Sequence, residues 1–266
     1  MQLSGKSALL TGATGGLGRA IAVEMAGRGA SLILSARSGD ALEQLAGELP
    51  GDGHLSIPAD LSQAGAGTKL IADAGDFDIL VANAGVRGAG ALTDYSDEEI
   101  ERAIRINLDA PVRMARAAMD RMRERRSGHL VFIASLAAKA APPRGSLYNA
   151  TKAGLRGFAI GLRGDLAPYG VGVSLVSPGF VRDAGMFANS GSKPPPGLGT
   201  TTPDRVGAAV VRAIESNKLE IAVAPIQQRF ASHLALASPG FGLRVQSGGF
   251  ARRAAAEATV GDDDKP

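Results

Sequence analysis

Short apolar runs alternate along the chain with segments whose apolar residues recur at helical spacing. Residues 7–11, Ser-Ala-Leu-Leu-Thr, form one such run, and in the segment after it Leu17, Ile21 and Met25 share one helical face. The pattern repeats to about residue 223 and predicts strands near 6–11, 31–36, 53–58, 77–82, 129–134, 171–176 and 219–223. Helices are predicted between them, near 16–28, 39–48, 62–74, 97–126, 146–168 and 203–217. Such alternation is typical of an α/β fold, so we expect a doubly wound, mostly parallel seven-stranded sheet with helices on both faces.

Composition fits a single domain of this kind over residues 1–224. The chain has 266 residues and contains no internal repeat or long linker. No apolar run approaches the roughly 20 residues of a membrane-spanning helix, and the first strand follows the N-terminus too closely for a signal peptide. Cysteine is absent, which excludes disulfides and thiolate metal sites, and we expect a cytoplasmic protein. The net charge of +3 is small and the basic residues are dispersed, so no nucleic-acid partner is expected.

Three residues in the second half of the chain are spaced as a catalytic set. Tyr148 and Lys152 are four residues apart within the predicted helix 146–168, so they share one face of it. Ser135 follows the strand near 129–134, thirteen residues before the tyrosine. A nearby ammonium group favours phenolate over phenol. We therefore expect Lys152 to lower the pKa of Tyr148 toward the range of a proton-transfer group.

A glycine-rich turn joins the first strand to the first helix. Residues 11–18 read Thr-Gly-Ala-Thr-Gly-Gly-Leu-Gly. Glycines in a strand-to-helix turn allow the backbone to approach a phosphate closely, and the free N–H groups and dipole of the following helix attract it. The sequence therefore predicts a dinucleotide site at the carboxyl end of the first strand.

Over residues 4 to about 224 the chain resembles the short-chain dehydrogenase/reductase family of the classical type. The motifs that carry the resemblance occur in the family's order: Thr11-Gly12 to Gly16 with Gly18, Asn83-Ala84-Gly85, Asn107, Ser135, Tyr148, Lys152 and Pro178-Gly179. The resemblance implies a Rossmann-type fold, a homodimer or homotetramer, and hydride transfer between a nicotinamide and a carbonyl or carbinol carbon. The motifs say little about the substrate, for which we expect a small carbonyl compound or alcohol, apolar in character.

The resemblance also implies roles for four catalytic residues. Tyr148 would be the general acid in reduction, and Ser135 would hydrogen-bond the substrate oxygen. Lys152 would bind the nicotinamide ribose hydroxyls and bias the titration of Tyr148. Asn107 would bend its helix and hold a water that links Lys152 to solvent.

Cofactor preference is expected at the end of the second strand, about 20 residues after the glycines, where an acidic side chain would bind the adenosine ribose. Ser35-Ala36-Arg37 stands there instead. Arg37 either lies in a solvated loop or pairs with a 2′-phosphate, and we expect NADP(H), with NAD possible. By resemblance, Asp60 would contact the adenine. The other expected cofactor-binding residues are Gly12, Thr14, Gly16, Leu17, Gly18, Leu61, Asn83, Ala84, Gly85, Tyr148, Lys152, Pro178, Gly179 and Val181.

One departure from the family pattern lies two residues after Val181, where Asp183 replaces the usual threonine. Asp183 either accepts a hydrogen bond from the nicotinamide carboxamide or is a solvated loop residue. Residues 184–202 are rich in glycine, proline and serine, and we expect them to form a mobile substrate lid.

The expected substrate pocket is mainly apolar. Met186 and Phe187 in the lid would face Leu136 and Ala137, which follow the catalytic serine. Arg144 either anchors an acidic substrate or faces solvent, and the second alternative is favoured.

Beyond the last motif, residues 225–257 are predicted to form a helical extension, and 258–266 a disordered acidic tail. A glycine-rich loop is expected before Phe250. Burial of the extension's apolar stripe on the protein's own core is the favoured expectation, while covering the active site, dimerisation and contact with a membrane surface stay open. The stripe consists of Ile226, Phe230, Leu234 and Ala237, with Arg229 and His233 off it.

Function classes other than this oxidoreductase also stay open. The same fold can serve a dinucleotide-binding sensor or regulator, although the complete set of Ser135, Tyr148 and Lys152 argues for an enzyme. Scaffolding through the C-terminal helix is a further alternative. An epimerase or dehydratase is disfavoured because no second acid–base candidate accompanies the set. The three histidines are isolated from one another, so no metal site is expected.

Overall fold

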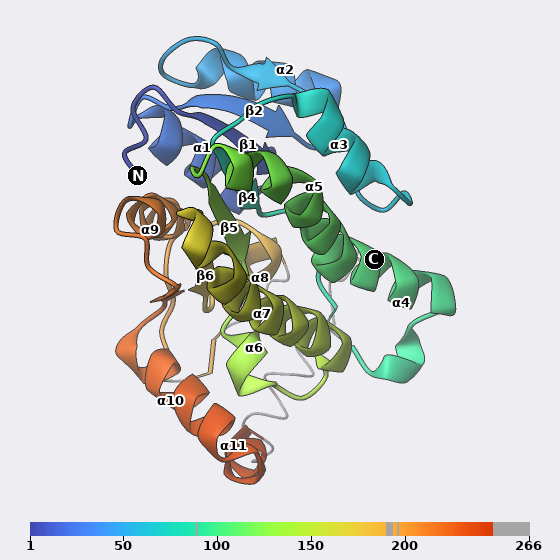
Figure 1. Cartoon of the computed structure of the whole chain (residues 1–266). Helices are drawn as coiled ribbons and strands as arrows, with labels where there is room; N and C mark the ends of the chain where they lie inside the picture. The colour runs from blue at the N-terminus through green and yellow to red at the C-terminus, as the bar shows by residue number, and fades with distance from the viewer. Residues whose placement is uncertain (89, 190–193, 196, 247–266) are drawn as a thin grey trace.

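The computed structural model describes residues 1–88, 90–189, 194–195 and 197–246. Within these ranges seven strands form one sheet in the order β3-β2-β1-β4-β5-β6-β7 (Figure 1). The predicted strands are confirmed, and every pairing is parallel, so the sheet is fully rather than mostly parallel. The strands are β1 (Ser7–Thr11), β2 (Ser31–Ser35), β3 (Leu55–Ser56), β4 (Ile79–Ala82), β5 (His129–Ile133), β6 (Gly172–Pro178) and β7 (Glu220–Val223).

The strand order reverses at the centre of the sheet. β1 pairs with β2 on one side and with β4 on the other, so that Leu9 lies opposite both Ile33 and Leu80. The chain leaves β1 toward one edge of the sheet and leaves β4 toward the other. The loops after these two strands therefore separate, which opens a crevice at their carboxyl ends.

Helices cover both faces of the sheet, as predicted. One face carries α1 (Gly16–Ala26), α2 (Gly39–Glu48) and α9 (Pro203–Glu215), and the other carries α3 (Ala66–Ala74), α5 (Ala110–Glu124) and α7 (Ser146–Leu166). Successive strand residues point to opposite faces. In β1, Leu10 belongs to the core beneath α1 and Leu9 to the core beneath α5 and α7. Both faces are therefore filled, and the strand ends are left to bind ligands.

The predicted helix over 97–126 is interrupted in the structure. α4 (Asp97–Ile104) and α5 are joined by a π-helical turn, Arg105–Asp109, which contains Asn107. π-turns often mark functional positions. The bend expected at Asn107 stays a prediction. Two helices of four residues, α6 (Ala137–Ala140) and α8 (Met186–Asn189), were not predicted.

The C-terminal extension forms α10 (Ile226–Ala237) and α11 (Pro239–Gln246), seen at the lower end of Figure 1. The helix α10 was predicted, but the burial of its apolar stripe was wrong: Ile226 and Phe230 are 65% and 70% exposed. Its buried residues are Gln228, Ser232 and Ala235.

The helix α11 occupies a part of the chain for which a glycine-rich loop was expected. Its Gly242 packs so closely on Ala235 of α10 that a Cβ there would lie 2.7 Å from the alanine Cβ. Phe250 and the predicted acidic tail lie outside the described residues. None of the helices in the described ranges combines the length and the apolar character needed to cross a membrane.

Candidate active site

One cavity of about 1520 Å³ lies at the carboxyl ends of the central strands and extends to α10 and α11. Ser135, Tyr148 and Lys152 line it, and so does every residue predicted to bind the cofactor. Asn107 is buried behind the wall and does not line the cavity. The structure thus brings together residues that are spread from the first strand to the sixth.

The glycine-rich turn has the shape of a phosphate cradle. Gly12 has φ +64°, and a Cβ there would lie 2.9 Å from Ala84 Cα, so a larger residue would be both strained and crowded. A Cβ on Gly18 would collide with the carbonyl oxygen of Gly12. No side chain caps the N-terminus of α1, whose N-cap is Gly15. The turn and the helix end therefore fit the pyrophosphate of a dinucleotide.

Asn83 joins the two strands that border the crevice. Its side-chain amide donates to the carbonyl oxygens of Thr11 and Gly12, at 3.0 and 3.1 Å. The Thr11 hydroxyl in turn accepts from the backbone N–H groups of Asn83 and Ala84, both at 3.1 Å. These four bonds fix the end of β4 to the glycine-rich turn.

Asn107 holds the loop after β4, which forms part of the cavity wall. Its Oδ1 accepts from the Val86 N–H at 2.8 Å, and its Nδ2 donates to the Val86 carbonyl at 2.9 Å. The π-helical turn directs this side chain across to the loop after β4. The expected water link to Lys152 stays a prediction.

Ser135 lies between β5 and α6, and its Oγ accepts from the Ala137 N–H at 3.1 Å. A buried ion pair anchors this short helix, because the Lys139 ammonium lies 2.9 Å from the Glu220 carboxylate of β7. No sequence motif indicates this pair, since its two residues are far apart along the chain.

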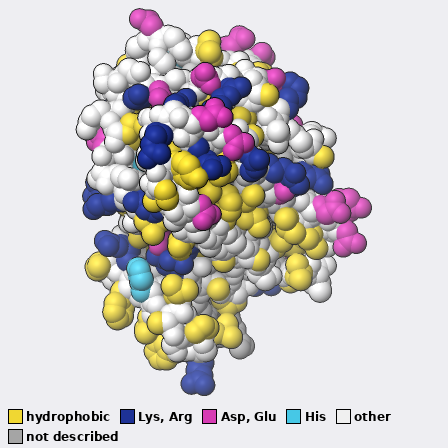
Figure 2. Space-filling model, viewed as in Figure 1, with side chains coloured by type: hydrophobic (Ala, Val, Ile, Leu, Met, Phe, Trp, Pro, Cys, Tyr) yellow, Lys and Arg dark blue, Asp and Glu magenta, His cyan; other side chains and the backbone are white. Residues whose placement is uncertain are grey.

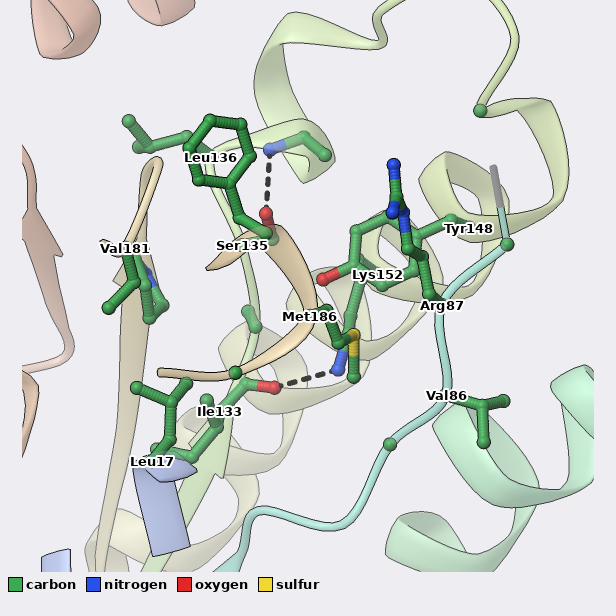
Figure 3. Close-up of a pocket in the computed structure, with 18 of the residues that line it drawn as sticks. Leu17, Val86, Arg87, Ile133, Ser135, Leu136, Tyr148, Lys152, Val181 and Met186 are labelled. Atoms are coloured by element: carbon green, nitrogen blue, oxygen red, sulfur yellow. Dashed lines mark hydrogen bonds between the residues drawn. The ribbon is translucent and has the colours of Figure 1, made fainter. Parts of the chain in front are cut away.

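Tyr148 and Lys152 lie one turn apart on α7, as the spacing predicted. The Lys152 ammonium donates to the Ile133 carbonyl at 3.0 Å and lies 5.7 Å from the centroid of the Tyr148 ring. Figure 3 shows Tyr148, Lys152 and Arg87 on one side of the cavity, with Ser135 opposite. Burial lowers the pKa of Lys152 from its usual 10.5 to about 8.

The expected effect of Lys152 on Tyr148 is not found in this structure. Burial raises the pKa of Tyr148 above its usual value of 10, while a hydrogen bond with Ser135 and the charge of Arg87 act in the opposite direction. The prediction failed because desolvation destabilises the phenolate more than these contacts stabilise it. Tyr148 is therefore protonated at neutral pH and able to donate a proton.

At the other end of the cavity, Arg37 follows β2 and is exposed. Across from it, Asp60 accepts from the hydroxyl and the N–H of Ser62, at 2.7 and 3.0 Å. Hydrogen bonds from Ser62 hold the pKa of Asp60 below its usual value, and the charge of Arg37 adds to this. A guanidinium at this rim suits an anionic group beyond the ribose.

These motifs and their geometry agree with a direct comparison of sequences. The family model for short chain dehydrogenases matches residues 6–195. The chain belongs to the short-chain dehydrogenase/reductase family. It is therefore an NAD(P)-dependent oxidoreductase, which decides against the non-catalytic sensor.

Relatives of this short-chain dehydrogenase/reductase include the ketoacyl reductase HetN of Nostoc sp., which is 36% identical over 83% of the chain and 79% of the relative. A short-chain dehydrogenase from Sphingobium yanoikuyae in complex with NADPH is similar in structure, with a TM-score of 0.77, 28% identity, and coverage of 89% of this chain and 94% of that one. A 3-oxoacyl (acyl-carrier-protein) reductase from Agrobacterium tumefaciens with NADP bound gives a TM-score of 0.76 at 26% identity, covering 83% and 93%.

The segment expected to be the lid of this dehydrogenase lies against the cavity. A Cβ built on Gly85 would lie 3.5 Å from Lys152 Nζ and 3.6 Å from Met186 Cε, so Met186 reaches toward the catalytic lysine (Figure 3). The rings of Phe187 and Phe180 are in contact, with centroids 4.8 Å apart and planes tilted by 42°. The mobility of this segment stays a prediction.

Two polar residues of uncertain role in the sequence also line the cavity. Asp183 has φ +71° and its carboxylate pairs with the neighbouring Arg182 at 3.1 Å, with both side chains exposed. Arg144 is exposed at the rim, with φ +59°. Contact of Asp183 with the cofactor and contact of Arg144 with a substrate stay predictions.

Gln228 is a residue of the site that the sequence analysis missed. It is buried, its Oε1 accepts from the Phe180 N–H at 3.2 Å, and its Nε2 donates to the carbonyls of Leu198 and Gly199 at 3.1 and 2.7 Å. A Cβ on Gly179 would collide with it. In the sequence, Gln228 could be noticed only as a polar residue of a predicted helix that lies off the apolar stripe, and this does not indicate that it lines the site.

Among the described residues, no group of histidine, cysteine, aspartate and glutamate side chains is arranged to hold an ion. His54 bonds the backbone of β2, His129 is buried beside Ser174, and His233 bonds its own helix.

Proposed function

We propose that the protein is an NADPH-dependent carbonyl reductase whose substrate is a 3-oxoacyl thioester. The observation that carries the proposal is one continuous cavity, with the glycine-rich turn and Arg37 at one end and Ser135, Tyr148 and Lys152 at the other. A dinucleotide bound at the first end would extend its nicotinamide toward a carbonyl substrate at the second end.

Residues 12–18 would hold the pyrophosphate, Arg37 the 2′-phosphate, and Lys152 the nicotinamide ribose. When bound, the nicotinamide supplies the hydride. Ser135 Oγ would donate a hydrogen bond to the substrate carbonyl oxygen, and Tyr148 Oη would transfer its proton to that oxygen as negative charge develops there. The protonated phenol that burial favours is the form this step requires.

The preference for NADPH over NADH is proposed from Arg37 and the absence of a carboxylate at the end of β2. Relatives that were solved with NADPH or NADP bound support it.

The substrate class is proposed from the other end of the cavity and from two relatives. Apolar side chains suited to an acyl chain line this end: Leu136, Met186, Phe187, Leu234, Phe241 and Val245. HetN is named a ketoacyl reductase, and the Agrobacterium protein reduces 3-oxoacyl groups on a carrier protein, as its name states.

The test follows the absorbance of the reduced nicotinamide with 3-oxoacyl thioesters of increasing chain length, each matched by its 3-hydroxyacyl counterpart as a blank. We expect oxidation of NADPH faster than that of NADH, with kcat/KM rising with chain length. Turnover of simple ketones alone would overturn the substrate class, and a preference for NADH would overturn the cofactor.

A further inference from the structure

The C-terminal helix α10 packs with two polar side chains inward, and α11 packs against α10. Gln228 and Ser232 of α10 are 6% and 1% exposed and face the body of the protein. A helix at the surface of a protein in water normally has the opposite arrangement. The outward side carries large exposed apolar residues, which we call the C-terminal apolar face: Ile226, Phe230, Leu236, Phe241, Leu243 and Val245.

Specific contacts hold the two helices in this orientation. Gln228 is bonded to three backbone groups of the loops beside the cavity. At the far end, the Gln246 side chain donates to the Ala140 carbonyl of α6 at 2.9 Å, and Gly242 allows α11 to lie close on α10. The apolar face is thus held outward. Figure 2 shows hydrophobic side chains gathered at the lower end of the molecule, where Figure 1 shows these helices.

The charged side chains of the C-terminal segment are all positive from Ile221 to Ala256. Between Ile221 and Ala256 the sequence contains four arginines and no aspartate or glutamate. Arg229 and Arg244 are exposed on the two helices, and within the described ranges no carboxylate forms an ion pair with either. A second copy of this face would bring like charges together, whereas an anionic surface would attract it.

The cavity opens at the same face. Phe241 and Val245 belong to the C-terminal apolar face and also line the cavity, as does the exposed Leu234 of α10. An apolar molecule leaving a lipid surface would therefore reach the cavity without crossing water.

We propose that the C-terminal apolar face docks on an anionic lipid surface, with the mouth of the cavity turned toward that surface. Large apolar side chains enter the boundary between headgroups and acyl chains, and arginines beside them bind anionic headgroups. Residues 247–266 are a poor cover for the face, because Phe250 and Val260 are their only large apolar residues. The proposal does not depend on which carbonyl compound is reduced.

The test is co-sedimentation of the full chain with phosphatidylcholine vesicles that contain or lack phosphatidylglycerol. The double substitution Phe230→Glu with Leu243→Glu changes two residues that do not line the cavity. Val23→Glu with Leu55→Glu is the matched control, since these residues are similarly exposed on α1 and β3.

We expect the unaltered chain and the control to sediment with anionic vesicles, and the Phe230→Glu/Leu243→Glu protein to lose affinity by about tenfold or more for each buried side chain. Arg229→Gln with Arg244→Gln should weaken binding in the same direction, and added salt should reduce that difference. Absence of the unaltered chain from the vesicle pellet, or equal binding of the Phe230→Glu/Leu243→Glu protein, overturns the proposal.

Two further measurements separate the other occupants of the face. Sedimentation velocity without lipid identifies a second copy if the Phe230→Glu/Leu243→Glu protein alone dissociates to a smaller species, and this result would contradict the proposal. Vesicle binding that appears only after removal of residues 247–266 would assign the face to that segment and would likewise contradict it. We expect the chain ending at Gln246 to bind as the full chain does.

Discussion

At the scale of single residues, burial decides how the catalytic pair titrates. The spacing of Tyr148 and Lys152 predicted their placement on one helix face, and the structure agrees. The sequence does not specify how deeply they are buried, because burial depends on β5, β6 and the loop after β4 packing around α7. Burial favours the neutral form of each group, raising the pKa of Tyr148 and lowering that of Lys152 to about 8.

Arg37 is the residue on which the proposed cofactor preference depends. Arg37→Asp should lower kcat/KM for NADPH relative to NADH by roughly tenfold to a hundredfold, because a charge-assisted pair contributes about 1.5–3 kcal/mol. Steady-state kinetics with both cofactors measures the ratio. Arg205→Asp on α9, exposed and outside the cavity, is the control. An unchanged ratio in the Arg37→Asp protein would mean that Arg37 is only a surface residue.

His129 should make stability depend on pH. Burial lowers its pKa from 6.5 to about 3, and its Nε2 lies 2.8 Å from Ser174 Oγ. Between these values the unfolded chain binds the proton and the folded chain does not. The contribution of His129 to the free energy of unfolding is therefore fully present above pH 6.5. As the pH falls toward 3, this contribution decreases by at most about 1.4 kcal/mol per pH unit.

Urea unfolding between pH 7 and 4.5 tests this account of His129. His129→Asn should flatten the dependence of unfolding free energy on pH, whatever its effect at pH 7. His233→Asn removes an exposed histidine and should leave the slope as it was. Equal slopes for the unaltered chain and the His129→Asn protein would contradict the assignment.

At the scale of elements, the periodicity of apolar residues predicted the strands and the long helices correctly. It failed for the very short helices, and it gave the wrong buried side for α10. The seven strands and the long helices carry several repeats of their pattern. The helices α6 and α8 have four residues each, about one turn, so no periodicity is available to detect them. In α10 the period was right and the buried side was wrong, because Gln228 gains backbone hydrogen bonds that an apolar residue could not make.

Gln228→Ala tests how α10 supports the site. Loss of its bonds to Phe180, Leu198 and Gly199 leaves backbone groups without their partner and should lower the free energy of unfolding by about 1–3 kcal/mol. Because Phe180 precedes Val181, KM for NADPH should rise more than kcat falls. Thermal unfolding and steady-state kinetics measure these effects, with the exposed Gln227→Ala as control. Equal behaviour of the two variants would show that α10 does not support the site.

At the scale of the whole molecule, parallel strands explain why motifs far apart in sequence meet. Their carboxyl ends share one edge, so the turn after β1, the loops after β4 and β6 and the start of α7 enclose one cavity. That convergence could be predicted from the order of the motifs. The part of the cavity wall that α10 and α11 add could not be predicted, because it depends on contacts such as Gln246 with Ala140 that no local pattern records.

The most direct test of the account is the turnover of a Tyr148→Phe protein. The substitution removes the proton donor and little packing, so NADPH should bind with a Kd within roughly threefold of the unaltered chain, while kcat falls by ~10²–10⁴-fold. Binding is followed by titration of cofactor fluorescence and kcat by NADPH oxidation with the best 3-oxoacyl substrate. A kcat within roughly threefold of the unaltered chain would contradict the central claim that Tyr148 donates the proton in this cavity.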